Sequence, residues 1–177
     1  VETTARSAEP LVFAARKERA KQSWQRLPVG GVTFDDATAY AAWLAQSGRV
    51  RGARLCTEFE WERAARGADD REFPHGDTLD ASEANHDATY NKDNAALGPD
   101  EVGSYPISRS PFGIDDLAGN VFEWVQSSLK KDDIVARSGA FLTPELTLRS
   151  TNRNVFDRVF RDPSIGFRIC ASWPYES

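Results

Sequence analysis

The sequence predicts an α+β domain with little regular secondary structure. Three observations predict it: two short amphipathic helical patterns, a few short runs of strand-forming residues, and a long irregular stretch between them. That stretch runs from Gly67 to Gly113 and is rich in Asp, Asn, Gly and Pro. Because an irregular region of this length is unusual in a compact domain, its backbone groups need partners, and bound cations are one candidate. The 177 residues suit one domain with its own core.

The first third of the chain contains the helical patterns. Residues 1–10 have the composition of a tail, and 11–25 favour a helix with one apolar side. A Pro-Val-Gly-Gly break precedes a strand-like Val32–Phe34, after which Asp35 or Asp36 can cap a helix over 36–47. A second helix is expected over 58–66, where Thr57 and Glu60 fit a capping box. We therefore divide the chain into an N-terminal extension, 1–27, and a domain, 28–177.

The last third of the chain contains the strand patterns and much of the expected core. Short strands are predicted over 122–125, 134–137 and 165–171. Large aromatic side chains within or beside the expected elements are most simply core residues rather than cofactor ligands. These aromatic residues are Trp43, Trp61, Phe112, Phe122 and Trp124.

Charge and hydropathy exclude some functions. The net charge is −5, from 22 Lys and Arg against 27 Asp and Glu, and this argues against a nucleic-acid-binding protein, which normally has a basic face. No run approaches about 18 apolar residues, so we expect no membrane span. No signal peptide is visible, and the cytoplasm is favoured as the compartment. Because the chain starts at Val1 rather than Met, we expect it to be part of a longer chain.

Two cysteines, Cys56 and Cys170, lie far apart in the sequence. They are too few and too distant for a zinc site. Two buried free thiols are the favoured interpretation, because a chain of this length builds a core without a disulfide. Pairing is the alternative if the fold brings them together.

A series of motifs in a fixed order carries the strongest information. They are Pro28-Val29, Tyr40-x-x-Trp43, Arg54-Leu55-x-Thr57-Glu58-x-Glu60-Trp61, Val102-Gly103-Ser104-Tyr105-Pro106, Gly119-Asn120-Val121-Phe122-Glu123-Trp124, Arg149-Ser150-x-Asn152-Arg153 and Gly166-Phe167-Arg168. In this order they resemble the formylglycine-generating-enzyme (sulfatase-modifying factor) family, from about Pro28 to Ala171. The resemblance implies a variant of the C-type lectin fold. Residues 1–27 match the start of the family poorly.

The resemblance also shows what this chain lacks. Catalytic members use two copper-binding cysteines just after a Gly-Gly-Ser-type motif, and the corresponding stretch here, 137–148, has no cysteine. A second enzymatic branch holds iron through histidines, whereas this chain has only His75 and His86. We therefore assign no catalytic residue and expect neither copper nor iron.

Structural calcium is the cofactor that the resemblance implies. Calcium takes oxygen ligands from side chains and carbonyls, and irregular loops supply both. Carried over by motif, the first expected site uses Asn85, Asp93 and the carbonyl of His86, with Asn94 as an alternative to Asp93. The second uses Asn120, Glu123 and the carbonyl of Val121. Ordinary loop hydrogen bonds are the alternative role for all of these residues.

The scaffold motifs are present, but the stretch that holds the catalytic cysteines in other members has a different sequence here. We therefore expect a non-catalytic domain that binds a protein or a small ligand. Similar domains occur beside bacterial Ser/Thr kinases and as the variable proteins of diversity-generating retroelements. The expected recognition surface is the stretch 141–164, in which Arg149 and Arg153 are expected to be partly buried and paired with acids. The candidate ligand-binding residues are Asn152, Asn154, Phe156, Asp157, Phe160 and Arg161. An enzyme of this family with cysteine-independent chemistry and a purely structural module are the alternatives.

Overall fold

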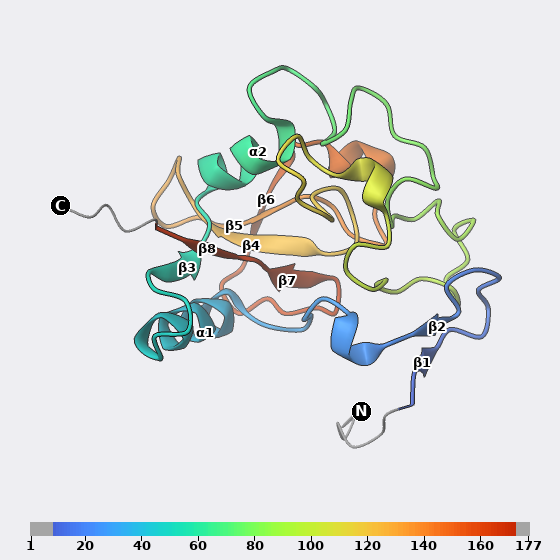
Figure 1. Ribbon diagram of the computed structural model, residues 1–177, viewed down its shortest axis with the longest axis horizontal. Helices are drawn as coiled ribbons and strands as arrows, with labels where there is room; N and C mark the ends of the chain where they lie inside the picture. Colours follow the sequence, from blue (N-terminus) through green and yellow to red (C-terminus); the bar gives the residue numbers. More distant parts are fainter. Residues whose placement is uncertain (1–8, 173–177) are drawn as a thin grey trace.

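A computed structural model of the chain describes residues 9–172. Ten strands and helices are named in Figure 1. They are β1 (Leu11–Val12), β2 (Lys21–Gln22), α1 (Phe34–Gln46), β3 (Ala53–Leu55), α2 (Glu58–Arg66), β4 (Phe122–Gln126), β5 (Ile134–Arg137), β6 (Arg153–Phe156), β7 (Ile165–Phe167) and β8 (Ile169–Ala171). Single 3-10 turns occur at Trp24–Arg26, Pro106–Ser108 and Glu145–Leu148. The expected α+β domain with little regular structure is confirmed.

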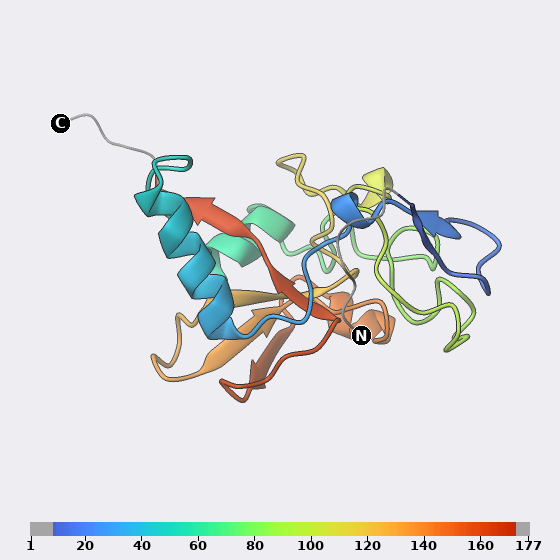
Figure 2. The same cartoon turned by 90° about the horizontal axis from the view of Figure 1, so that it is seen from below.

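The main sheet has four strands in the order β6-β5-β4-β7. The β6–β5 and β5–β4 pairs are antiparallel, whereas β4 and β7 are parallel. A second ladder pairs β3 with β8, and Figure 1 shows the strands lying between α1 and α2. The long loops between α2 and β4 fill the side of the molecule away from the helices, beside the β1–β2 hairpin (Figures 1 and 2).

Both helices begin with the capping chemistry that their sequences predict. Thr57 and Glu60 form the expected reciprocal box, and Arg54 adds a bidentate ion pair to Glu60. Helix α1 begins two residues earlier than expected, because Thr33 rather than Asp35 or Asp36 is the N-cap. Thr33 accepts a hydrogen bond from the Asp36 N–H and therefore belongs to the helix cap, not to a strand.

The core confirms three of the five aromatic predictions. Trp61 and Trp124 are fully buried in two separate apolar clusters, and Phe122 is buried in the same cluster as Trp124. Trp43 and Phe112 were wrongly expected in the core, since they are 47% and 57% exposed. Trp43 contacts Tyr40, one turn earlier on α1, and both side chains remain 47% exposed. Periodicity alone does not distinguish a covered apolar stripe from an uncovered one.

Residues 11–25 form a hairpin and not the expected helix. Strands β1 and β2 pair at Leu11–Gln22 and Val12–Lys21, and the turn between them carries Arg16. Arg16 is buried because it reaches Asp100, far away in the sequence. A helical pattern of charged residues with few apolar positions is a weak signal, and here a long-range ion pair overrides it.

The favoured interpretation of two free thiols is also wrong. Cys56 and Cys170 form a disulfide with an S–S distance of 2.02 Å. Their proximity follows from the β3–β8 ladder, in which Arg54 lies opposite Cys170 and Cys56 follows directly after β3. That ladder joins segments more than one hundred residues apart, so no local pattern reveals it. Among residues 9–172, no helix has the length and apolar character needed to cross a bilayer.

Candidate functional site

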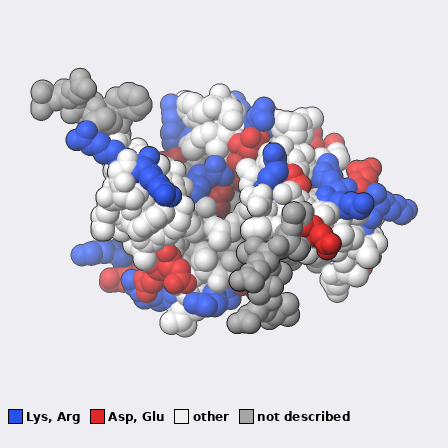
Figure 3. All heavy atoms as spheres, turned by 60° about the horizontal axis from the view of Figure 1, so that its bottom comes forward, with Lys and Arg blue, Asp and Glu red and all other residues white. Residues whose placement is uncertain are grey.

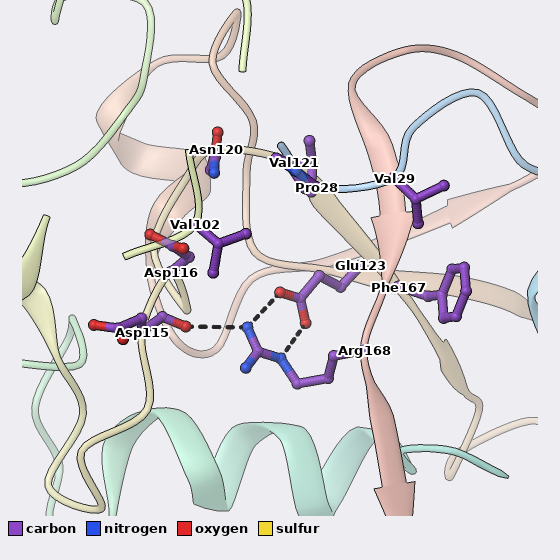
Figure 4. Close-up of a pocket in the computed structure, with 10 residues that line it drawn as sticks. All are labelled: Pro28, Val29, Val102, Asp115, Asp116, Asn120, Val121, Glu123, Phe167 and Arg168. Atoms are coloured by element: carbon purple, nitrogen blue, oxygen red, sulfur yellow. Dashed lines mark hydrogen bonds and ion pairs between the residues drawn. The ribbon is translucent and has the colours of Figure 1, made fainter. Parts of the chain in front are cut away.

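A cavity of about 390 Å³ opens beside the parallel pair β4–β7. Figure 4 shows its lining, which combines apolar walls with four charged side chains. The lining residues are Pro28, Val29, Val102, Asp115, Asp116, Asn120, Val121, Glu123, Phe167 and Arg168. Acidic and basic side chains are interspersed over the face seen in Figure 3, which is hollowed near its centre.

Glu123 is the most heavily bonded acid in this cavity. Strand β4 places it inside the fold, where it is 5% exposed. Its carboxylate accepts two hydrogen bonds from the Arg168 guanidinium, at 2.6 and 2.7 Å, and one from the Trp61 indole N–H at 2.7 Å. Arg168 also donates to the Asp115 carbonyl, so it spans the cavity as Figure 4 shows. The negative charge of Glu123 is thus compensated by the chain itself.

Asp116 is an acid of the cavity that sequence reasoning missed. It is 8% exposed, its backbone φ is 59°, and it accepts a hydrogen bond from the Gly103 N–H at 2.8 Å. It forms none of the ion pairs found among residues 9–172. Burial, helped by neighbouring Asp115, raises the pKa of Asp116 to about 6. The sequence signal that could have identified Asp116 is its position four residues before Asn120, in the same loop.

The structure brings Asn85 and Asn120 together, from the two expected calcium sites. The Asn85 side-chain N–H donates to Asn120 Oδ1 at 3.3 Å, and the Asn120 backbone N–H donates to the Asn85 carbonyl at 2.8 Å. Asn120 also exchanges two hydrogen bonds with the backbone of Asp100. Asn120 therefore acts as a bridge between two segments of the long loop, which is the alternative role considered for it.

The remaining members of the first expected calcium site do not fit a cation as they are arranged. Asp93 is exposed, and its Oδ1 caps the Ala95 N–H. The His86 carbonyl accepts the Thr89 N–H. Asn85 Oδ1 is buried without a hydrogen-bond partner among the described residues, so one oxygen of the expected set remains open.

The second expected site fits better, because Asn120, Val121 and Glu123 all line the cavity of Figure 4. Asp116 adds a carboxylate that has no ion pair among the described residues. No group of three or more His, Cys, Asp or Glu within residues 9–172 is arranged to hold a metal ion. A cation there would rely on carbonyl and amide oxygens and on water, as calcium often does.

The stretch 141–164 combines a largely exposed loop, 157–161, with core residues. Phe156 and Phe160 were expected to be exposed, but they are half-buried and stack on each other at 4.8 Å. Phe156 also contacts Trp124 edge-on at 5.5 Å. The reason is the strand β6, which the sequence did not reveal and which turns Phe156 onto the main core.

The other predicted residues of this stretch differ in accessibility. Asn152 donates a hydrogen bond to the Ser138 carbonyl, and Asn154 is half-buried rather than exposed. Asp157 and Arg161 are exposed as expected. Val159, between them, is 76% exposed and was not predicted to bind.

Arg149 and Arg153, two of the four arginines of this stretch, have the acidic partners expected of them. Arg153 bonds Glu58 and Asp133, both at 2.8 Å, and Arg149 pairs with Glu72 at 3.0 Å. Of these two arginines, Arg153 is the more deeply buried and holds β6 to α2.

A larger cavity, of about 510 Å³, lies beside Arg158 in the loop 157–161. It is bounded by Arg158 from that loop, by Phe34 at the start of α1, and by the β4–β5 connection at 127–133. Arg158 is paired with Asp35 at 2.6 Å. Arg158 therefore connects the loop 157–161 to a cavity whose other walls belong to the scaffold.

The stretch 137–148, which corresponds to the cysteine-containing segment of catalytic members, offers no metal-binding thiolate. It contains no cysteine, and both cysteines of the chain are in the disulfide. There is also no room for a side chain at Gly139, since a Cβ there would lie 2.6 Å from side-chain atoms of Leu148 and of Thr147. The two histidines lie outside this stretch. His75 is paired with Glu83, and His86 lies beside Asp87.

Comparisons with known proteins agree with these features. The family model of the sulfatase-modifying factor enzyme 1-like domain matches residues 5–172. The chain belongs to this family. The match extends well into residues 1–27, which the motifs alone had left out.

Individual relatives are larger proteins. A hercynine oxygenase of Mycolicibacterium smegmatis is 40% identical over 108 residues, covering 58% of this chain and 22% of the oxygenase. A serine/threonine-protein kinase, pkn1 of Chlamydia caviae, is 39% identical over 100 residues, covering 56% of this chain and 13% of the kinase. The chain thus spans about a fifth or less of these two proteins.

Among solved structures, Treponema denticola variable protein 1 has a TM-score of 0.74 at 18% identity, covering 91% of this chain and 77% of the other. At this identity the likeness shows the fold alone, and it confirms the predicted family fold.

Proposed function

We propose that this family member is a non-catalytic binding domain. One observation carries the proposal: the stretch where catalytic relatives are expected to hold their copper-binding cysteines has none, and both cysteines of the chain form a disulfide. A thiolate is the nucleophile and the soft metal ligand in such chemistry, and a disulfide sulfur provides neither. The rest of the scaffold is kept, which suits a domain that positions loops for recognition.

The proposed recognition surface is loop 157–161 with the adjacent cavity. Asp157, Arg158, Val159 and Arg161 are exposed, and they follow β6, whose packing fixes the start of the loop. Within residues 9–172, the ion-pair partners of Arg158 and Arg161 are two exposed acids on α1, Asp35 and Asp36. Exposed ion pairs of this kind are weak, so these side chains can turn toward a ligand at little cost.

Panning a random peptide library on the folded domain tests this surface. Selected peptides should bind the wild type and lose binding to the triple variant Asp157→Ala, Val159→Ser, Arg161→Ala. The matched control carries Val12→Ser, Lys17→Ala and Glu18→Ala on the hairpin, where the same residue classes are exposed.

Three results of this panning experiment would contradict the proposed surface. The first is equal binding by the triple variant. The second is loss of folding in the triple variant. The third is failure to select any peptide on the folded wild type. Surface changes normally cost under about 0.5 kcal/mol, so the triple variant should remain folded.

The setting of the domain is a further part of the proposal. A kinase is among the relatives, which supports a sensor-like module attached to a larger protein. Disulfides persist mainly in oxidising compartments, so the Cys56–Cys170 bond weighs against the cytoplasmic location that the sequence favoured.

Calcium remains our proposal for the cavity of Figure 4 and not for the first expected site. Asn120, Val121 and Glu123 line this cavity, and Asp116 adds a buried carboxylate without an ion pair among the described residues. When bound, calcium would supply positive charge that orders the loop around it. Asp116, the carbonyl oxygens and water would hold it, because Glu123 already bonds Arg168.

Cysteine-independent catalysis in the same cavity is the second candidate function. A hercynine oxygenase is similar over part of this chain, and the pKa of Asp116 near 6 suits a general base. If Asp116 is the general base of such a reaction, an Asp116→Asn variant that still folds should lose catalytic turnover.

A further inference from the structure

The loop 96–100 surrounds one fully buried cation that the chain itself provides. The guanidinium of Arg16 donates to the Ala96 carbonyl at 2.6 Å and to the Gly98 carbonyl at 2.8 Å. It also pairs with Asp100 at 2.7 Å, and neither side chain of this pair is exposed. All three nitrogens of the guanidinium therefore have an oxygen partner in a single loop.

Asp100 is the anionic centre of this arrangement. Besides Arg16, its carboxylate accepts hydrogen bonds from the hydroxyls of Tyr90, at 2.8 and 2.9 Å, and Tyr105, at 2.5 Å. The Gln22 amide of β2 adds a further donor at 3.2 Å. Burial and the Asp100 charge raise the pKa of Tyr105, so its hydroxyl remains a donor.

The flat faces of the guanidinium are covered as well. The Arg16 Cζ atom lies 3.6 Å from the ring centroid of Phe13 and 4.1 Å from that of Tyr90. A Cβ on Gly98 would lie 2.4 Å from the Phe13 ring, so glycine is needed for this close approach. The site is built for a planar cation, which Arg provides and Lys does not.

This occupancy bears directly on the first expected calcium site. The long irregular loop was expected to need a cation, yet Asp93 of that site is exposed and capping its own turn. Asn85 instead donates to the Gly98 carbonyl, the same oxygen that accepts from Arg16. The positive charge at this loop comes from the hairpin, which lies beside the loops in Figures 1 and 2.

We infer that Arg16 is the resident cation of the loop 85–100: its guanidinium occupies a built oxygen-lined site, so this loop is ordered by the β1–β2 hairpin and not by a metal ion. The hairpin is then a structural part of the domain rather than an extension. Without Arg16, the buried Asp100 carboxylate would lose its ion-pair partner, which is among the most destabilising of single changes. The emptied site would still be shaped for a guanidinium group.

Hydrogen exchange of peptides from 85–100, followed by mass spectrometry, tests the inference. In Arg16→Ala, exchange in these peptides should accelerate at least about a hundredfold, because a buried ion pair has lost one partner. Guanidinium chloride at low millimolar concentration should restore much of the protection, and equal sodium chloride should not. Arg158→Ala, which removes an exposed arginine, is the matched control and should behave like the wild type.

Several results would overturn the inference. One is loss of protection over 85–100 when a chelator is added to Asp116→Asn, which already lacks the carboxylate of the proposed calcium site, since the loop would then depend on another metal ion. Another is unchanged protection in Arg16→Ala. If Arg16→Ala does not fold, Arg16→Lys replaces it: Lys keeps the charge without the planar fork, so guanidinium rescue should again exceed the sodium chloride effect. A Lys variant as protected as the wild type, or one that guanidinium does not rescue, also contradicts the inference.

Discussion

Reducing the Cys56–Cys170 disulfide should greatly destabilise the domain. The bridge closes a loop with a sequence separation of 114. In the chain-entropy model a loop of this length restricts the unfolded state by about 5 kcal/mol at 25 °C. For a chain of this size, such a loss lowers the melting temperature by about 10–20 °C. Thermal unfolding with and without reductant measures this shift directly.

The same experiment needs a thiol count and a control. Titration of the denatured, non-reduced protein with a thiol reagent should find no free thiol. The double variant Cys56→Ala, Cys170→Ala should melt near the reduced wild type and should not respond to reductant. Two titratable thiols, or identical melting of the oxidised and reduced proteins, would refute the disulfide and restore the free-thiol interpretation.

Three further predictions concern the cavity beside β4. Glu123→Gln should lose at least about 2 kcal/mol of stability in urea unfolding, because Arg168 is left without its carboxylate; a loss below about 0.5 kcal/mol contradicts this. In chelator, the contribution of Asp116 to stability, taken as the difference between the wild type and Asp116→Asn, should fall as pH rises from about 4 to 6, since the raised pKa of Asp116 means that folding favours its protonated form. Asp116→Asn should therefore be more stable than the wild type by about 2–3 kcal/mol at pH 7, and a difference that does not change with pH refutes the assignment. Calcium should raise the melting temperature of the wild type and not of Asp116→Asn, and equal curves with calcium and chelator contradict calcium binding.

Local chemistry made both helices and four of the eight described strands, β4, β5, β7 and β8, predictable. The Thr57–Glu60 box marks the start of α2, and the apolar runs around Trp124 and Ile165 mark strands of the sheet. These signals lie within a few residues of the elements that they specify. The motif order then supplied the family, and the family supplied the fold.

The features that the sequence did not reveal depend on contacts between distant segments. The disulfide needs the β3–β8 ladder, and the burial of Arg16 needs Asp100, about half the chain away. Phe156 appeared suited to recognition because an aromatic residue in a polar stretch resembles a binding residue. Its strand is four residues long and is held, among the described strands, by β5 alone, so its core role appears only in three dimensions.

The candidate site was predictable in part for the same reason. The motif placed Asn120, Val121 and Glu123 at one cavity, but their present partners, Asn85 and Arg168, come from other segments. Asp116 escaped notice because its environment, and not its sequence neighbours, makes it unusual.

Incubation with copper and a sulfatase-type Cys-x-Pro-x-Arg peptide tests the central claim, that this domain does not catalyse thiol-dependent oxidation. Mass spectrometry reports whether the peptide cysteine is converted to formylglycine. With no thiolate in 137–148 and both cysteines in a disulfide, the peptide should remain unchanged relative to a copper-only control. Conversion above that control would contradict the proposal of a non-catalytic binding domain.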